Sequence, residues 1–124
     1  MFFFFYGSFK AEQPGWERVG LRQRDFTEII DPRALASGKL YLQTSDDTPH
    51  PAFVPDPIER ELTVGELHKL LPMDTAKKEF LLAALHDLEN YTATDILLYQ
   101  PKIEALTWAW NRSIIDLPVI RSWP

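Results

Sequence analysis

The sequence predicts an α+β fold, in which a small antiparallel sheet from the N-terminal half packs against a C-terminal helical half of three to four short helices. Three observations predict this fold. The chain opens on a run of aromatic residues, which favour strands. A proline-rich segment interrupts the chain before its middle. After that segment, apolar residues recur at the spacing of an amphipathic helix.

The length of 124 residues is typical of a single domain. Within it, we expect residues 1–44 to be mainly β and residues 45–61 to form a proline-rich loop. Residues 62–112 should be helical. Residues 113–124 are too apolar for a free tail, so they should form either a docked tail or an edge strand, a position that suits the proline at 118.

The N-terminal aromatic run, residues 2–6, reads as a central strand because both of its alternating faces are apolar. The alternative is an aromatic patch or sheet edge offered to a partner. Residues 16–21 and 39–44 are expected to be further strands. Residues 26–30 fit a strand or the start of a helix, and the pair Asp31-Pro32 fits the start of a helical turn.

The segment 45–60 contains four prolines, a density that argues against both a helix and a paired strand. We therefore expect it to be extended, with Phe53 and Val54 as apolar anchors in its middle. Long irregular loops often carry function, so the segment is a candidate binding arm. The alternative is a surface linker whose Phe53 packs back on the domain.

Four helices are expected in residues 62–112. Thr63 and Glu66 have the spacing of a capping box and predict a short first helix. A second should run from Asp74 to about Asn90, since Asn tolerates the left-handed conformation that ends a helix. A short third should start at residue 92 or 94, and a fourth at residue 101. The apolar stripes of the second and fourth helices are Phe80, Leu81, Ala84, Leu85 and Leu88, and Ile103, Leu106, Trp110 and Ile114.

The composition excludes several kinds of chemistry. The chain has no cysteine, so disulfides, thiolate metal sites and thiol catalysis are absent, and a reducing compartment such as the cytoplasm fits. A net charge of −5 argues against direct binding to nucleic acid or to a membrane. The nearest approach to a metal site is Asp46, Asp47 and His50, but paired loop acids are usually only solvated. We expect no metal, no cofactor and no catalytic residue.

The aromatic content points instead to a protein partner. Aromatic residues make up 13% of the chain, and Trp, Tyr and Arg are enriched at binding hot spots. Trp108 lies off the stripe of its predicted helix and beside Arg112. The alternative is that Trp108 packs against the tail or the N-terminal sheet. The predicted partner-binding residues are Trp108, Arg112, Phe53, Val54 and Tyr99.

These features favour a small acidic, non-catalytic binding module: an inhibitor or adaptor, like those that phages and plasmids encode, that covers a surface of a larger partner. If so, Trp108→Ala should weaken binding and leave the melting temperature nearly unchanged. The first alternative is a structural or assembly subunit that forms a homo-oligomer. The second is a small enzyme that works through His68 or through the loop of Asp46, Asp47 and His50, which requires a pocket that contains one of these residues.

Overall fold

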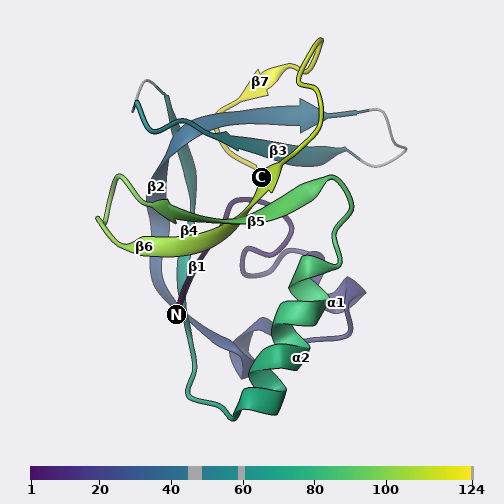
Figure 1. Cartoon of the computed structure of the whole chain (residues 1–124), viewed down its shortest axis with the longest axis vertical. Coiled ribbons are helices and arrows are strands. Elements are labelled where there is room, and N and C mark those ends of the chain that lie inside the picture. Colours follow the sequence, from purple (N-terminus) through teal and green to yellow (C-terminus); the bar gives the residue numbers. More distant parts are fainter. Residues whose placement is uncertain (45–48, 59–60, 124) are drawn as a thin grey trace.

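The computed structural model describes residues 1–44, 49–58 and 61–123. Within these ranges the chain is mostly β, and its seven strands form one mixed sheet that curls into a nearly closed barrel (Figure 1). Six strands follow the order β3-β2-β4-β1-β6-β5, and β7 pairs with β2. The predicted division into a β half and a helical half is therefore wrong.

The strand β1 (Phe2–Phe5) lies in the middle of this sheet. It pairs antiparallel with β4 (Leu62–Leu70) and parallel with β6 (Glu104–Trp110). Phe4 packs inside the barrel, whereas Phe3 and Phe5 pack on the opposite face. The prediction of a central strand that is buried on both faces is confirmed.

The long strand β2 (Thr27–Gln43) belongs to two pairings. Its first part pairs with β4 as far as Ser37, and from Gly38 onward it pairs with β3 (His50–Pro55). Gly38 has φ of 151°, and a side-chain carbon there would lie 2.5 Å from the carbonyl oxygen of Val54. Only glycine fits a position with this backbone conformation and this close approach.

The prediction that prolines exclude a paired strand from the segment 45–60 is wrong for β3. This strand lies at the edge of the sheet, where a residue without an N–H is tolerated. Pro51 pairs with Leu42, and Pro55 pairs with Gly38. Phe53, between them, is fully buried.

Three of the four predicted helices are strands: β4, β5 (Tyr91–Leu97) and β6. The capping-box pattern at Thr63 occurs in β4, where the Thr63 hydroxyl donates to the carbonyl of Gly38 at 3.0 Å. In β6, Ala105 packs inside the barrel, and Leu106 and Trp108 pack outside it. A strand that is apolar on both faces also satisfies helical spacing, because apolar residues occupy nearly every position.

The helix α2 (Thr75–His86) confirms the predicted second helix and its start, although it ends at His86 and not near Asn90. Asp74 caps it by accepting from the N–H of Lys77 at 2.8 Å, and Asn90 adopts the left-handed conformation, with φ of 70°. Its buried face is narrower than the predicted stripe. Leu81 is fully buried, whereas Phe80 is 60% exposed.

The remaining elements are short. Residues predicted as a second strand form the helix α1 (Gly15–Arg18), and a turn of 3₁₀ helix, η1 (Gln23–Asp25), precedes β2. The predicted helical turn at Asp31-Pro32 is wrong, since both residues lie in β2. The strand β7 (Val119–Ile120) pairs with β2 at Leu40 and Tyr41. No helix in the described ranges is both long and apolar enough to cross a membrane.

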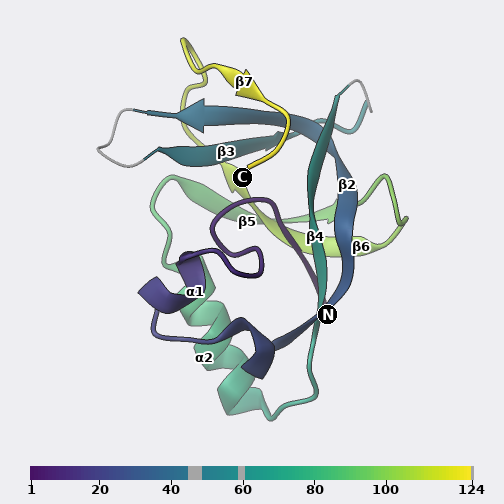
Figure 2. The ribbon, with the colours of Figure 1, turned by 180° about the vertical axis from the view of Figure 1, so that it is seen from behind.

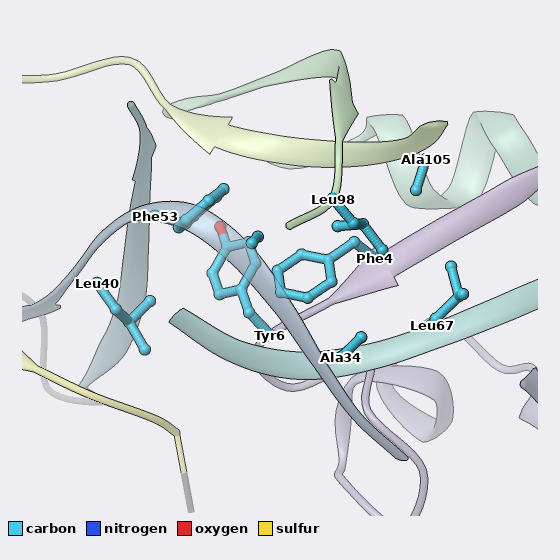
Figure 3. Packing of buried hydrophobic residues seen from close by; sticks show 9 residues of the cluster. Phe4, Tyr6, Ala34, Leu40, Phe53, Leu67, Leu98 and Ala105 are labelled. Carbon is cyan, nitrogen blue, oxygen red and sulfur yellow. The ribbon is translucent and has the colours of Figure 1, made fainter. Parts of the chain in front are cut away.

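Two apolar clusters lie on the two sides of the sheet. The interior cluster fills the barrel, where Phe4, Tyr6 and Phe53 point toward one another (Figure 3). Its members are Phe4, Tyr6, Ala34, Ala36, Leu40, Phe53, Leu67, Leu98 and Ala105. The helix-side cluster joins β1 and β6 to α1 and α2. Its members are Phe3, Phe5, Phe9, Trp16, Phe26, Leu81, Leu85 and Trp108.

Candidate functional site

A cavity of about 320 Å³ lies where β1 ends and the chain turns toward α1. Its wall combines the end of β1, α1, the facing ends of β2 and β3, the turn after α2, and β6. In Figure 2 the loop after β1, in purple, lies between the barrel and α1. The polar and charged residues of the wall are Tyr6, Ser8, Arg18, Gln43, His50, Glu89, Asn90 and Tyr91.

The pocket loop, residues 6–10, forms one side of the cavity. The N–H of Lys10 donates to the carbonyl of Gly7 at 3.0 Å and closes a turn. Gly7 lets this turn approach β3, since a side-chain carbon at position 7 would lie 2.6 Å from Cγ of Pro51. The N–H of Gly15 donates to the carbonyl of Ser8 at 2.8 Å, and the indole N–H of Trp16 donates to the carbonyl of Phe9 at 2.7 Å. The carbonyl groups of the loop are thus held by the protein.

Two backbone N–H groups of the same loop, unlike its carbonyl groups, have no hydrogen-bond partner among the described residues. Within the described ranges, the backbone N–H groups of Ser8 and Phe9 donate to no acceptor. Both residues line the cavity. Neighbouring backbone donors of this kind can bind a carboxylate or stabilise an oxygen on which negative charge develops.

Glu89 supplies the carboxylate of the cavity wall. It lies in the turn between α2 and β5 and is exposed to solvent. The adjacent residue, Asn90, fixes this turn to the end of β6: its carbonyl accepts from the N–H of Asn111 at 2.9 Å, and its side chain accepts from Arg112 at 2.7 Å. Glu89 is therefore held beside the cavity by the contacts of its neighbour Asn90, which do not involve its own side chain.

Aromatic side chains form much of the rest of the wall. Trp108 stacks on Phe5 with ring centroids 5.8 Å apart, and its indole N–H donates to Nδ1 of His86 at 3.0 Å. The Tyr91 hydroxyl donates to the carbonyl of Pro51 at 2.6 Å and so links β5 to β3. Burial, with a further contribution from Tyr91, raises the pKa of the Tyr6 hydroxyl well above its ordinary value. Tyr6 is thus a protonated donor, bound to the carbonyl of Trp108 at 2.5 Å, and not a base.

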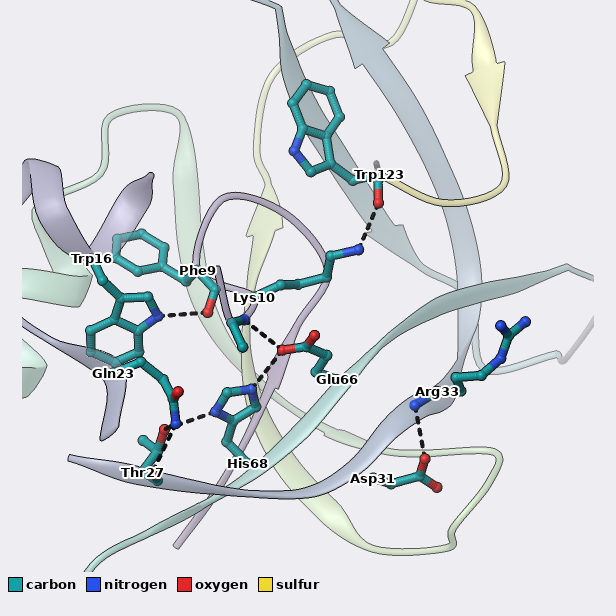
Figure 4. A network of polar contacts seen from close by, with 11 residues as sticks. Phe9, Lys10, Trp16, Gln23, Thr27, Asp31, Arg33, Glu66, His68 and Trp123 are labelled. Carbon is teal, nitrogen blue, oxygen red and sulfur yellow. Dashed lines mark hydrogen bonds and ion pairs between the residues drawn. The ribbon is translucent and has the colours of Figure 1, made fainter. Parts of the chain in front are cut away.

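A polar network lies next to the pocket loop but does not line the cavity (Figure 4). The imidazole of His68, which is fully buried, lies with Nε2 2.9 Å from Oε1 of Glu66 and with Nδ1 2.8 Å from the hydroxyl of Thr27. The same oxygen of Glu66 accepts from the N–H of Ala11 at 2.7 Å. Although burial raises the pKa of Glu66, the hydrogen bonds from His68 and Ala11 outweigh it and leave that pKa below its ordinary value.

The lowered pKa predicts an acid-dependent loss of stability. A carboxyl whose pKa is lower in the folded state stabilises the fold above its unfolded pKa, and this contribution disappears as the pH falls through the folded pKa. The free energy of unfolding of Glu66→Gln should therefore be lower than that of the wild type at neutral pH, and the difference should shrink on acidification. Urea unfolding at a series of pH values measures it. A difference that grows toward acid pH would contradict the assignment.

The predicted partner-binding residues do not form one exposed surface. Phe53 and Trp108 are 0% and 5% exposed, Val54 is partly buried, and Tyr99 and Arg112 are exposed. Trp108 is the member of this set that lines the cavity. Their role in binding a protein stays a prediction.

The residues of the enzyme hypothesis divide into three groups. His50 lines the cavity, which meets the condition that this hypothesis set. Asp46 and Asp47 lie outside the described residues. His68 belongs to the network beside the pocket loop. Within the described ranges, no group of three or more acidic or histidine side chains is placed to hold a metal ion.

Sequence reasoning missed the pocket loop and Glu89. The signal for the loop was Gly7-Ser8, which interrupts an aromatic run that would otherwise continue. Glu89 lies outside the apolar stripe of the second predicted helix, and its side chain is exposed. Glu89 lines a cavity only because β1 and β3 lie beside the turn that follows α2.

The expectation that Trp108→Ala leaves the melting temperature nearly unchanged requires an exposed indole. Trp108 is buried, so this expectation is wrong, and the milder variant Trp108→Phe tests the buried placement. Trp108→Phe should lower the free energy of unfolding by about 1–2 kcal/mol, because it removes the bond to His86 and part of a buried ring system. Urea denaturation measures the change. Stability equal to the wild type would contradict the buried placement.

No family model matches the chain, and no curated protein matches its sequence. Several solved structures nevertheless resemble its structure. An AIG2-like protein from Mus musculus (GGACT) superposes with a TM-score of 0.64 at 17% identity, over 99% of this chain and 87% of that chain. The uncharacterized protein PH0828 from Pyrococcus horikoshii has a TM-score of 0.62 at 15% identity, over 98% of this chain and 86% of that chain. The protein ytfP from Escherichia coli has a TM-score of 0.55 at 20% identity, over 98% of this chain and 93% of that chain.

At these identities the likeness shows a shared fold, and the chain has the fold of an AIG2-like protein. The expectation of a viral inhibitor or adaptor is corrected here. None of these three proteins is described as an inhibitor, an adaptor or a viral protein. The features that suggested such a role have structural explanations, since the proline-rich segment contains an edge strand and Trp108 is buried.

Proposed function

We propose that the protein is a small enzyme that cleaves an amide bond of an amino-acid-like substrate, with Glu89 as the general acid and base. The observation that carries the proposal is the meeting of the pocket loop and Glu89 at one cavity. The loop supplies the backbone donors of Ser8 and Phe9, and Glu89 supplies a group that can accept and release a proton. These are the two components that acyl transfer requires.

The reaction balances with these groups alone. Glu89 takes a proton from the attacking nucleophile, water in the simplest case, as the new bond to the amide carbon forms. The carbonyl oxygen accepts from the loop N–H groups while it carries negative charge. Glu89 then gives its proton to the amide nitrogen as the carbon–nitrogen bond breaks, and it returns to its starting state.

A covalent route through Ser8 has less support. A serine is a weak nucleophile unless a base activates it. The Ser8 hydroxyl lies against Gly15, where a side-chain carbon would be 2.9 Å away, and no hydrogen bond joins it to a base within the described residues. Glu89 acting directly on the nucleophile is the simpler mechanism.

The wall of the cavity favours a small zwitterionic substrate. Its volume of about 320 Å³ is at the small end of ligand pockets. Arg18 and Glu89 place opposite charges on the wall, and Trp108 and Trp110 supply apolar surface between polar groups. An amino-acid amide or a dipeptide combines a charged group, an amide and a short apolar part. The cysteine-free composition is compatible with a reducing compartment, so we also propose the cytoplasm as the site of action.

The test is a panel of dipeptides and amino-acid amides incubated with the protein and followed by proton NMR. We expect one chemical class to lose its amide bond, with shifts in the backbone N–H signals of Ser8 and Phe9 on binding. A panel in which no member is cleaved and none shifts these signals would overturn the proposal.

A further inference from the structure

A continuous chain of hydrogen bonds leads from η1 to the pocket loop (Figure 4). The side chain of Gln23 donates to the carbonyl and the hydroxyl of Thr27 at 2.8 and 3.0 Å. The Thr27 hydroxyl meets Nδ1 of His68, and Nε2 of His68 meets Glu66. Glu66 in turn accepts from the N–H of Ala11, the residue that follows the loop.

The donors of this chain can be assigned. Gln23 donates to the Thr27 oxygen, and with a neutral His68 the hydroxyl proton of Thr27 is donated to Nδ1 of His68. A neutral imidazole that accepts at Nδ1 carries its proton at Nε2 and donates it to Glu66. Every group then has a partner in a consistent direction, and Glu66 is the acceptor at the end of the chain.

We infer that Glu66 and His68 are positioning residues for the proposed reaction, which hold the pocket loop in the shape that presents the N–H groups of Ser8 and Phe9. The inference rests on the proposed function. Neither residue lines the cavity, so neither touches a ligand there. They act through Ala11.

The geometry explains how the contact at Ala11 adds to the hydrogen bonds that shape the loop. His68 is fully buried, and its ring centroid lies 4.8 Å from that of Phe5 in an edge-to-face contact, so Oε1 of Glu66 is held from the helix side of the sheet. That oxygen fixes the N–H of Ala11, and the turn from Gly7 to Lys10 lies immediately before it. In a planar trans peptide the N–H and C=O groups point in opposite directions. The bond from Gly15 to the carbonyl of Ser8 therefore orients the N–H of Phe9, which belongs to the same peptide, and the bond from Ala11 to Glu66 fixes the end of the turn that carries this peptide.

The charge of Glu66 strengthens this contact. Hydrogen bonds to an ionised carboxylate are stronger than those between neutral groups. Glu66 is ionised at neutral pH, as its lowered pKa requires, and the groups with charge or protons that face it are His68 and Lys10. Lys10 is itself held, because its ammonium group donates to the carbonyl of Trp123 at 2.6 Å.

Two variants separate shape from charge. Glu66→Gln keeps an oxygen that can accept from both Ala11 and His68 and loses only the charge, whereas Glu66→Ala removes the acceptor. We expect Glu66→Ala to speed hydrogen exchange at the Ala11 amide by about tenfold or more, because the N–H loses its partner. Glu66→Gln should restore most of the protection.

Acetate serves as a carboxylate probe that does not depend on turnover. In the wild type, an acetate titration followed by NMR should shift the N–H signals of Ser8 and Phe9. Glu66→Ala should weaken acetate binding about threefold or more, because the donors are no longer held in one geometry, and Glu66→Gln should recover it. Glu104→Ala is the matched control, since this exposed acid lies at the far end of the β5–β6 hairpin and does not line the cavity.

The inference is overturned if acetate does not shift these signals in the wild type. It is also overturned if a folded Glu66→Ala keeps both Ala11 protection and acetate affinity. If Glu66→Ala does not fold, Glu66→Gln and Thr27→Val decide the matter, since Thr27→Val removes the partner of His68 Nδ1 and should loosen the loop. Failure of the proposed function would appear separately, as unchanged turnover in a variant of Glu89.

Discussion

Replacing Glu89 by glutamine should lower the turnover number by about 10²–10⁴-fold, the contribution of a positioned general acid or base. Glutamine has nearly the same shape as glutamate and cannot take up the proton of a nucleophile at neutral pH. The Michaelis constant should change less than the turnover number, because an isosteric side chain leaves the cavity wall intact. The measurement uses the substrate that the dipeptide and amide panel identifies.

Folding should not change in this variant, which makes the kinetic result easy to interpret. Glu89 is exposed, and the turn that carries it is held by the backbone and side chain of Asn90. Surface substitutions of this kind usually alter stability by about 0.5 kcal/mol or less. The melting temperature of Glu89→Gln should therefore match that of the wild type.

Asp87→Asn is the matched control. It makes the same change of charge two residues away, in the same exposed turn, and Asp87 does not line the cavity. Its turnover number should stay close to that of the wild type. Equal activity of Glu89→Gln and the wild type would reject Glu89 as the proton-transfer group, and His50 would become the next residue to test, because it lines the same cavity.

The parts of the fold that could be predicted from the sequence are those whose local pattern has one explanation. The helix α2 begins after the predicted capping residue, Asp74, although it ends at His86 and not at the predicted stop, Asn90. The aromatic residues of β1 favour a strand, and its apolar residues on both faces favour a buried one. In each case the deciding signal lies within the element itself.

The strand β6 could not be separated from a helix in this way. In β6 the two faces carry Ala105 and Thr107 on one side and Leu106 and Trp108 on the other, all at least partly buried. Such a strand loses the alternation that identifies a half-exposed strand, and helical spacing is then satisfied by chance. The parallel pairing of β1 with β6, which joins the β5–β6 hairpin to the rest of the sheet, brings together Phe3 and Leu106 from opposite ends of the chain.

The candidate site was hidden for a related reason. Its components come from positions near 8, 50 and 89 of the chain, and no spacing rule connects them. Gly7 and Asn90 were visible as interruptions of regular structure, which is where backbone groups become free to bind ligands. The sequence therefore predicts where the chain turns, whereas the strand topology determines which of these turns lie side by side.

Phe53 is the core residue whose substitution best tests whether the proline-rich segment belongs to the barrel. Phe53→Ala should lower the free energy of unfolding by about 3–5 kcal/mol, the usual cost of emptying a buried aromatic site. Phe53 is 0% exposed, and its ring lies 5.2 Å from that of Tyr6 and 5.9 Å from that of Phe4. Urea denaturation or calorimetry measures the loss.

Phe80→Ala removes the same atoms from a side chain that is 60% exposed, so it should cost far less. If both variants lower the free energy of unfolding by the same small amount, Phe53 would be an anchor on a surface arm, as the proline-rich segment first suggested.

The Phe53→Ala substitution should also affect the wall of the cavity. Tyr6 begins the pocket loop and is bound to the carbonyl of Trp108, so a void beside its ring should loosen the loop. Faster hydrogen exchange at Ala11 in a still-folded Phe53→Ala would show that the barrel interior, as well as Glu66, supports the site.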